Sequence, residues 1–295
     1  MNAQAAQPAD PAAIHAAAFQ FVQSLAAELS TGKIDLPSFP DVAIRVRRAL
    51  ADERTSVDQV VRIVGSEPAL AARLLKMANS AALNRSGKPV TELRTAIARM
   101  GYNMVRSAAI SFAMAQIRAG AKLKGLEKPL EELWQHSTYV SAFCYVLAKN
   151  HTRRKPDEAF LAGLLHGVGR LYILARADRH SVLFSDPQAL EQVMRDWHAS
   201  IGKAILENWE MNEELVAAVA EQDDVGREHD GPADLADLLV CANMMGAYFN
   251  QPADLELNMQ GVTAFRMLGL DAANCTRVMS ECRGEIEALR QALGG

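Results

Sequence analysis

Aromatic residues make up only 6% of this 295-residue sequence, and the β-branched and aromatic runs that a β-sheet needs are scarce. Alanine is abundant instead, and its side chain loses no rotamer entropy in a helix. The hydrophobic fraction of 49% and the charged fraction of 22% are those of an ordinary globular protein and argue against a disordered chain. Composition therefore predicts an all-α protein.

No C-x-x-C pair occurs among the four cysteines, which favours buried thiols in a reducing compartment over a metal knuckle. No segment reaches the roughly 18 uninterrupted apolar residues of a membrane span. The best candidate, 160–175, is broken by His166, Gly167, Gly169 and Arg170. The first residues lack the basic segment of a secretory signal. We therefore expect a cytoplasmic protein.

Helix signals follow one another closely along the chain. Ser56-x-x-Gln59 is a capping box, Pro68 sits in a first-turn position, and Asp186-Pro187 combines a cap with a first turn. Pro232 is expected to open a later helix after the charged linker 222–231. These signals predict two helical groups, separated by a Gly- and Lys-rich stretch at 120–128.

Three of the seven histidines lie in unusual contexts. His136 follows Trp134 on a predicted helix, and His198 precedes Gly202. His166 lies in the apolar run A-G-L-L-H-G-V-G-R at 162–170. The remaining four are interpreted as surface or hydrogen-bonded core residues: His15, His151, His180 and His229.

The run at 162–170 resembles the G-L-L-H-D-I-G-K metal-binding signature of HD-domain phosphohydrolases. L-P-S-F-P at 36–40, E-P-A-L-A-A-R-L-L-K-M-A-N-S at 67–80 and L-R-T-A-I-A-R-M-G at 93–101 resemble the HDOD domain, an HD-related, all-helical bacterial signalling module. The resemblance implies a multi-helix bundle in two helical groups. It also implies a domain organisation: a disordered lead-in and an amphipathic helix in 1–33, the HDOD domain in 34–227, and a helical extension packed on it in 228–295.

The resemblance also places the residues of the HD metal site on this chain. His136 matches the first ligand histidine and His166 matches the H of the H-D pair, but the D position holds Gly167. His198 matches the next histidine of the branch that cleaves cyclic dinucleotides. The His-His pair of that branch falls on Glu221 and its neighbour.

The final aspartate of the HD site falls on Asn243, so two ligand carboxylates are replaced by groups that carry no negative charge. The resemblance therefore implies no catalytic residue, no cofactor and no phosphohydrolase activity. It implies a regulatory module that binds a partner signalling protein or a small ligand, alongside cyclic-dinucleotide or two-component signalling. The expected working surface is a cleft between the helical groups near His136, His166 and His198.

Two alternatives stay open. Three imidazoles and Glu221 could still hold one Zn²⁺, Ni²⁺ or Fe²⁺, as in a degenerate phosphohydrolase with a mononuclear metal site.

A DNA-binding regulator is the second alternative. It is suggested by Arg45-x-Arg47-Arg48, by Arg85 and Lys88, and by the helix-Gly-helix rhythm of 96–105, which is typical of a helix-turn-helix. The net charge of -4 gives no overall attraction to phosphate, so nucleic acid is not the expected partner.

Overall fold

The computed structural model describes residues 11–31, 41–52, 54–84, 86–120, 126–176 and 186–293. Within these ranges the chain consists of helices joined by turns and contains no β-strand, which confirms the predicted all-α fold class. None of the helices described is both long enough and apolar enough to cross a membrane. Most of the predicted lead-in, the stretch 36–40, Arg85 and His180 lie outside the described residues.

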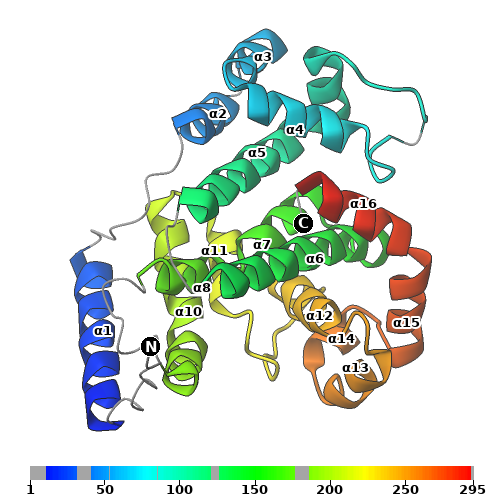
Figure 1. The fold of residues 1–295 in the computed structure, drawn as a ribbon. Coiled ribbons are helices and arrows are strands. Elements are labelled where there is room, and N and C mark those ends of the chain that lie inside the picture. Colours follow the sequence, from blue (N-terminus) through cyan, green and yellow to red (C-terminus); the bar gives the residue numbers. More distant parts are fainter. Residues whose placement is uncertain are drawn as a thin grey trace, which may run out of the picture.

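Helix α1 (Pro11–Thr31) stands at one side of the molecule and packs against α10 (Pro187–Asn208) (Figure 1). Its Phe21 and Leu25 are buried. Glu28 accepts a hydrogen bond from the Tyr172 hydroxyl and two from the Arg176 guanidinium, at 2.8 and 2.7 Å. Apolar packing and a bidentate ion pair therefore attach α1 to the second half of the chain.

Four helices form the upper lobe in Figure 1: α2 (Asp41–Ala51), α3 (Val57–Gly65), α4 (Pro68–Ala78) and α5 (Leu93–Gly120). The predicted capping box is present, because the side chains of Ser56 and Gln59 each bond the backbone of the other. Pro68 opens α4 as predicted. Asn79 follows α4 and pins the next loop by two 2.7 Å hydrogen bonds to the backbone of Val90.

Gly101 divides α5 into two helical segments. Its backbone, at φ 74° and ψ 163°, is not helical and lies in a region that glycine tolerates. Residues 107–114 of the second segment are all buried. A recognition helix must expose one face to enter a DNA groove. Residues 107–114 therefore cannot contact bases, whereas Gly101 is exposed and Tyr102 and Asn103, at the start of the segment, are half-buried.

The central helix of the second group is α6 (Glu127–His151), which packs against α7, α12 and α16. The group continues with α7 (Pro156–Leu165), α8 (Val168–Leu174), α10, α11 (Glu213–Ala220) and α12 (Leu235–Ala247). The buried apolar side chains of both groups join into one continuous core, with a small satellite at Ala78, Val90 and Ala96.

The C-terminal part folds onto this core. It comprises α13 (Pro252–Asn258), α14 (Thr263–Met267), α15 (Ala272–Glu281) and α16 (Arg283–Leu293). Helix α16 buries Ile286 and Leu289 and contacts both α6 and α4. Lys149 of α6 pairs with Glu285 at 2.5 Å. The last helix thus braces the two helical groups against each other.

Helix α10 begins at Pro187, as the cap and first-turn signal at Asp186-Pro187 predicts. One helix start differs from the prediction. Helix α12 begins at Leu235 rather than at Pro232, because Asp234 and Asp237 form a capping box there.

Candidate functional site

The three histidines singled out in the sequence come from three different helical segments. His136 lies in α6, His198 lies in α10, and His166 follows the last turn of α7. Asn243 approaches His136 from α12. The fold therefore gathers residues more than 100 positions apart in the sequence.

Two glycines allow the close helix contacts that bring these residues together. A Cβ added at Gly163 would lie 2.5 Å from Ser141 Cα, and one added at Gly169 would collide with the carbonyl oxygen of His198. Real Cβ atoms do not approach backbone this closely, so only glycine fits at either position. Gly163 therefore allows α7 to pack closely on α6, and Gly169 allows α8 to pack closely on α10.

His136 and His166 lie edge to face, with ring centroids 5.4 Å apart and an interplanar angle of 72°. His136 Nε2 donates a 2.7 Å hydrogen bond to Asn243 Oδ1. Burial lowers the pKa of His136, the Asn243 bond opposes this, and the charge of Arg170 adds to the lowering. His136 is therefore held neutral, and the nitrogen bonded to the amide cannot also bind a metal.

His166 is fully enclosed, at 3% exposure. Its Nδ1 donates to the carbonyl oxygen of Gly163 at 2.7 Å, and its own carbonyl accepts from Gln222 Nε2 at 3.1 Å. Burial lowers the pKa of His166 to about 3, and the charges of its neighbours add to the shift. The ring is neutral with its Nε2 lone pair free of a proton.

His198 lies between a carboxylate and a guanidinium. Its Nε2 is 2.7 Å from Asp223 Oδ2 and 3.3 Å from Arg170 Nη2. Burial raises the pKa of Asp223, but the hydrogen bond and charge of His198, with Arg170, outweigh it and hold that pKa below its usual value. The shorter contact is with a carboxylate, so Nε2 is the nitrogen that carries the proton.

Several buried polar atoms around this site have no hydrogen-bond partner among the residues that the structure describes: His198 Nδ1, Arg170 Nε and Gln222 Oε1. Buried polar atoms are normally paired, so an unpaired group indicates a missing partner such as a water or a ligand. We call His136, His166, Arg170, His198 and Asp223 the histidine site.

The carboxylates expected at this site are absent or point elsewhere. Glu221 does not join the histidines, because its Oε2 accepts a 2.9 Å bond from Arg227. Gln222 turns inward in its place, at 2% exposure. A Cβ at Gly167 would lie 2.9 Å from Ser137 Oγ and 3.0 Å from Leu133 Cδ1, so no larger side chain fits there without displacing both neighbours.

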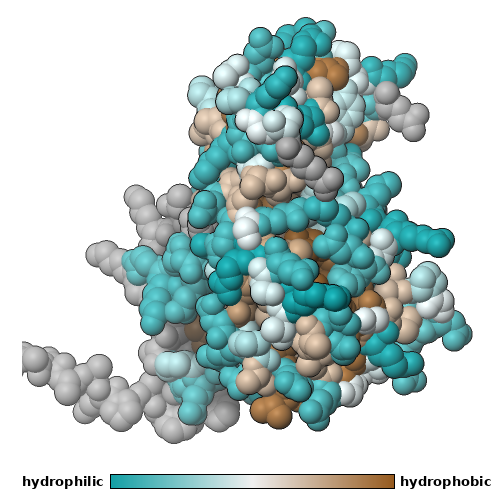
Figure 2. All heavy atoms as spheres, turned by 90° about the vertical axis from the view of Figure 1, so that its right-hand side faces the viewer, coloured by the Kyte–Doolittle hydropathy of each residue, from teal (hydrophilic) through white to brown (hydrophobic). Residues whose placement is uncertain are grey.

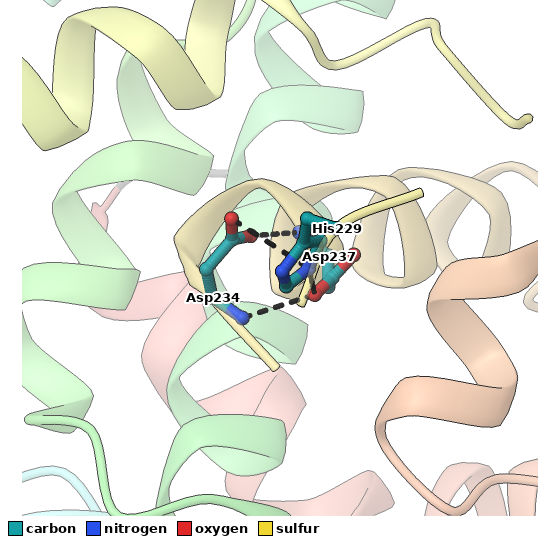
Figure 3. A group of neighbouring side chains, drawn as sticks. All are labelled: His229, Asp234 and Asp237. Carbon is teal, nitrogen blue, oxygen red and sulfur yellow. Dashed lines mark hydrogen bonds and ion pairs between the residues drawn. The ribbon is translucent and has the colours of Figure 1, made fainter. Parts of the chain in front are cut away.

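A second polar cluster lies at the start of α12, where sequence reasoning assigned His229 no role (Figure 3). His229 Nε2 is 2.8 Å from Asp237 Oδ2. Arg227 Nη1 donates to Asp237 Oδ1 at 2.7 Å, and the same guanidinium binds Asp234 at 2.9 Å. We call these four residues the Arg227 cluster. It fastens the predicted linker to the capping box of α12.

Neither group fits a metal ion. In the part of the chain that the structure describes, only His229, Asp234 and Asp237 bring three ligand atoms within 4.8 Å of one another. Their carboxylates already bind Arg227 and the backbone N–H groups of the cap. The predicted ligand set at the histidine site does not converge in this way, and a guanidinium lies beside it.

Sequence reasoning missed Arg170 and Asp223, whereas Gln222 is the neighbour of Glu221 on which the His-His pair falls. Arg170 is the last residue of the A-G-L-L-H-G-V-G-R run, and its positive charge near His166 is a sequence signal against a bound metal cation. Asp223 and Gln222 lie next to Glu221, and only the fold shows which of these side chains turns inward.

A cavity of about 630 Å³ lies in the C-terminal part and is not lined by the histidines. Its walls come from α13, α14, α15 and the turns between them, including Met259, Phe265 and Arg266.

Comparisons with known proteins place this arrangement in a family. The family model of the HDOD domain matches residues 36–225. A curated relative, an uncharacterised protein of Treponema pallidum (strain Nichols), is 23% identical over 205 residues. That match covers 66% of this chain but 39% of the relative, so the chain spans well under two thirds of that protein's length.

Solved structures share the fold. One, from Shewanella amazonensis SB2B, is named as a candidate metal-dependent phosphohydrolase: its TM-score is 0.79 and its identity 25%, covering 94% of this chain and 99% of that one. An HDOD domain protein from Geobacter sulfurreducens has a TM-score of 0.64 and 22% identity, covering 93% and 98%. A protein from Marinobacter aquaeolei VT8, named as a candidate signal transduction protein, has a TM-score of 0.62 and 20% identity, covering 95% and 66%. The chain belongs to the HDOD domain family.

Proposed function

We propose that this chain is a non-catalytic regulatory module of bacterial signal transduction, which binds a small anionic ligand or an acidic segment of a partner protein at the histidine site. One observation carries the proposal: a guanidinium lies beside the histidines that the resemblance aligns with metal ligands. Arg170 Nη2 is 3.3 Å from His198 Nε2. Its charge also lowers the pKa of His136 and of His166, after the larger effect of burial on each.

A divalent metal at the histidines would have to sit beside this positive charge. Metal-dependent phosphoester hydrolysis needs anionic ligands that hold the ion and lower the pKa of its water. Gly167 and Asn243 provide no such charge, Glu221 binds Arg227, and the carboxylate that is present, Asp223, already contacts His198 at 2.7 Å. The site therefore supports binding better than hydrolysis.

The character of the site favours an anionic group. Arg170 Nε is buried and unpaired, and guanidinium groups bind carboxylate and phosphate oxygens by paired hydrogen bonds. The Marinobacter relative's name as a candidate signal transduction protein agrees with a regulatory role. The Shewanella relative's name supports the alternative, a degenerate phosphohydrolase with one metal ion.

Metal analysis of the purified full chain, combined with a phosphodiesterase assay in Mn²⁺, separates these functions. We expect neither a stoichiometric transition metal nor hydrolysis. One metal ion per chain, with hydrolysis that disappears in a folded His166→Gln variant, would establish the phosphohydrolase instead.

Binding is tested separately by calorimetric titration with inorganic phosphate and with a cyclic dinucleotide. We expect the Arg170→Gln variant to lose any such binding, while Arg195→Gln, an exposed arginine on the same helix as His198, keeps it. Binding that survives Arg170→Gln would show that the ligand lies elsewhere.

A further inference from the structure

Charge is divided unevenly between the two halves of the molecule. Residues 41–120, which contain α2 to α5 and which we call the basic lobe, hold 13 Lys and Arg against 6 Asp and Glu, a net charge of +7. Residues 121–295 hold 17 against 26, a net charge of −9. The total of -4 conceals this separation. The basic lobe therefore attracts phosphate, although the chain as a whole carries a net negative charge.

Several cations of the basic lobe are exposed and available. Arg48, Arg62 and Lys76 lie in the last turns of α2, α3 and α4, and Lys88 lies in the loop before α5. All four are exposed and make no ion pair within the described ranges. Cations in the last turn of a helix are stabilised by the helix dipole, which explains the positions of Arg48, Arg62 and Lys76. Lys88 lies in a loop, so the dipole does not explain its position.

Two of these four available cations, Arg48 and Arg62, are arginines. The planar guanidinium binds phosphate oxygens bidentately and suits nucleic-acid contacts. Other arginines of the lobe are engaged within the protein, among them Arg47 with Glu210 and Arg94 with Asp58. The unpaired cations therefore carry the attraction to phosphate.

The lobe offers little to an apolar partner. Among the residues described, the large hydrophobic side chains that are exposed are Phe19, Val225 and Leu257, and none of these belongs to the basic lobe. Figure 2 shows the upper part of the molecule as mostly hydrophilic on the face it displays. Protein interfaces depend on buried apolar or aromatic anchors and membrane insertion on apolar wedges, so a phosphate polyanion fits this surface better.

We propose that the basic lobe binds nucleic acid through the phosphate backbone, without reading its sequence. Backbone contacts position a protein, whereas base contacts specify the sequence. Residues 107–114 of α5 are buried, so this stretch cannot enter a groove and supply base contacts. Phosphate would repel the acidic remainder of the chain. The basic lobe would therefore face the nucleic acid, and the rest of the molecule would point away from it. This inference is independent of the function proposed for the histidine site.

Fluorescence anisotropy of a labelled 20-base-pair duplex with the full chain, from 25 to 200 mM salt, tests the proposal. Four phosphate contacts predict binding that weakens about 100-fold between 50 and 200 mM salt. The variant Arg62→Gln/Lys76→Gln/Lys88→Gln is expected to lower the log–log salt slope by roughly 3.

A matched control removes the same charge elsewhere. Lys128, Arg195 and Lys203 are exposed cations of the acidic part, and their Gln variants are expected to leave the salt slope unchanged. Circular dichroism verifies that both triple variants fold.

Three outcomes would overturn the proposal: no binding at 25 mM salt, equal losses in both triple variants, or equally tight binding of polyglutamate or of phosphatidylserine vesicles. Polyglutamate binding would indicate an acidic protein partner, and vesicle binding a membrane surface.

Discussion

The histidine site and the Arg227 cluster contain the same kinds of side chain but differ in how fully these are hydrogen-bonded. In the Arg227 cluster, the buried Asp237 binds Arg227, His229 and the backbone of Asp234. At the histidine site, His198 Nδ1 and Arg170 Nε have no partner among the described residues, and neither does Oε1 of the adjacent Gln222. The Arg227 cluster leaves one such atom, Arg227 Nε, but both oxygens of its buried carboxylate are paired, which stabilises the fold. The carboxylate of the histidine site, Asp223, is instead half exposed. The two groups therefore differ in how deeply the carboxylate is buried and in how many polar atoms stay unpaired.

The largest expected effect comes from removing Arg227, and removal of Arg170 is its counterpart at the histidine site. Arg227→Met leaves Asp237 ionised, buried and without its cation, which costs about 3 kcal/mol of unfolding free energy. Arg170→Met costs under about 1 kcal/mol, because Asp223, at 46% side-chain exposure, regains water. Urea unfolding followed by circular dichroism measures both. Equal losses would abolish the distinction between the two groups.

The close helix contact beneath the histidine site gives the next effect. Gly169→Ala places a methyl group against the His198 carbonyl oxygen, and the resulting overpacking costs about 2 kcal/mol. Gly284→Ala in α16 is the matched control, since its Cβ would meet nothing within 4 Å and stability is expected to hold or rise slightly. A Gly169→Ala protein as stable as the wild type would show that α8 and α10 can separate freely.

The two groups predict opposite pH dependences. Burial holds the pKa of His166 at about 3, below its unfolded value of 6.5, so the unfolded chain binds more protons between these values and stability falls as pH falls from about 6.5 to about 3. The hydrogen bond to Asp237 raises the pKa of His229. The protonated His229 therefore adds to the free energy of unfolding at pH below 6.5, and this added stability is lost as pH rises through the raised pKa.

Unfolding measured across this pH range in two variants checks these signs. His166→Gln removes a slope of up to about 1.4 kcal/mol per pH unit on the acid side. His229→Gln removes the smaller loss of stability that the wild type shows as pH rises towards neutral. If both variants changed the same side of the profile, one of the two environments would be misassigned.

The smallest effect expected is that of added metal. Zn²⁺ or Mn²⁺ should leave the thermal unfolding midpoint of the wild type unchanged, because stabilisation requires binding to the folded state. Arg227→Met frees the oxygens of Asp234 and Asp237 beside His229, so Zn²⁺ should raise the midpoint of that variant. A rise in the wild type that disappears in His136→Gln would instead locate a metal at the histidine site.

Local signals in the sequence predicted much of the fold. The capping box at Ser56, the start of α4 at Pro68 and the end of a helical segment at Gly101 are each set by a few neighbouring residues, and all three are present. The start of α12 was misplaced because Pro232 and Asp234 both signal a helix start, and the hydrogen bonds of the Asp234 capping box decide between them.

The histidine site was predicted only in part. The resemblance brought His136, His166, His198 and Asn243 together, and the fold places Asn243 against His136. It assigned the carboxylate to Glu221, although Asp223 is the one beside His198. Which of several neighbouring side chains turns inward depends on packing between distant helices, and the sequence pattern does not contain that information.

The packing of α16 on both α6 and α4 has a consequence for synthesis. A nascent chain leaving the ribosome can form the helices of both groups before α16, which braces them, has been synthesised. Until α16 docks, the surfaces that Ile286 and Leu289 later cover stay exposed. Apolar surface of this kind attracts chaperones and promotes aggregation. The docking of α16 is therefore expected to protect the newly made chain from aggregation.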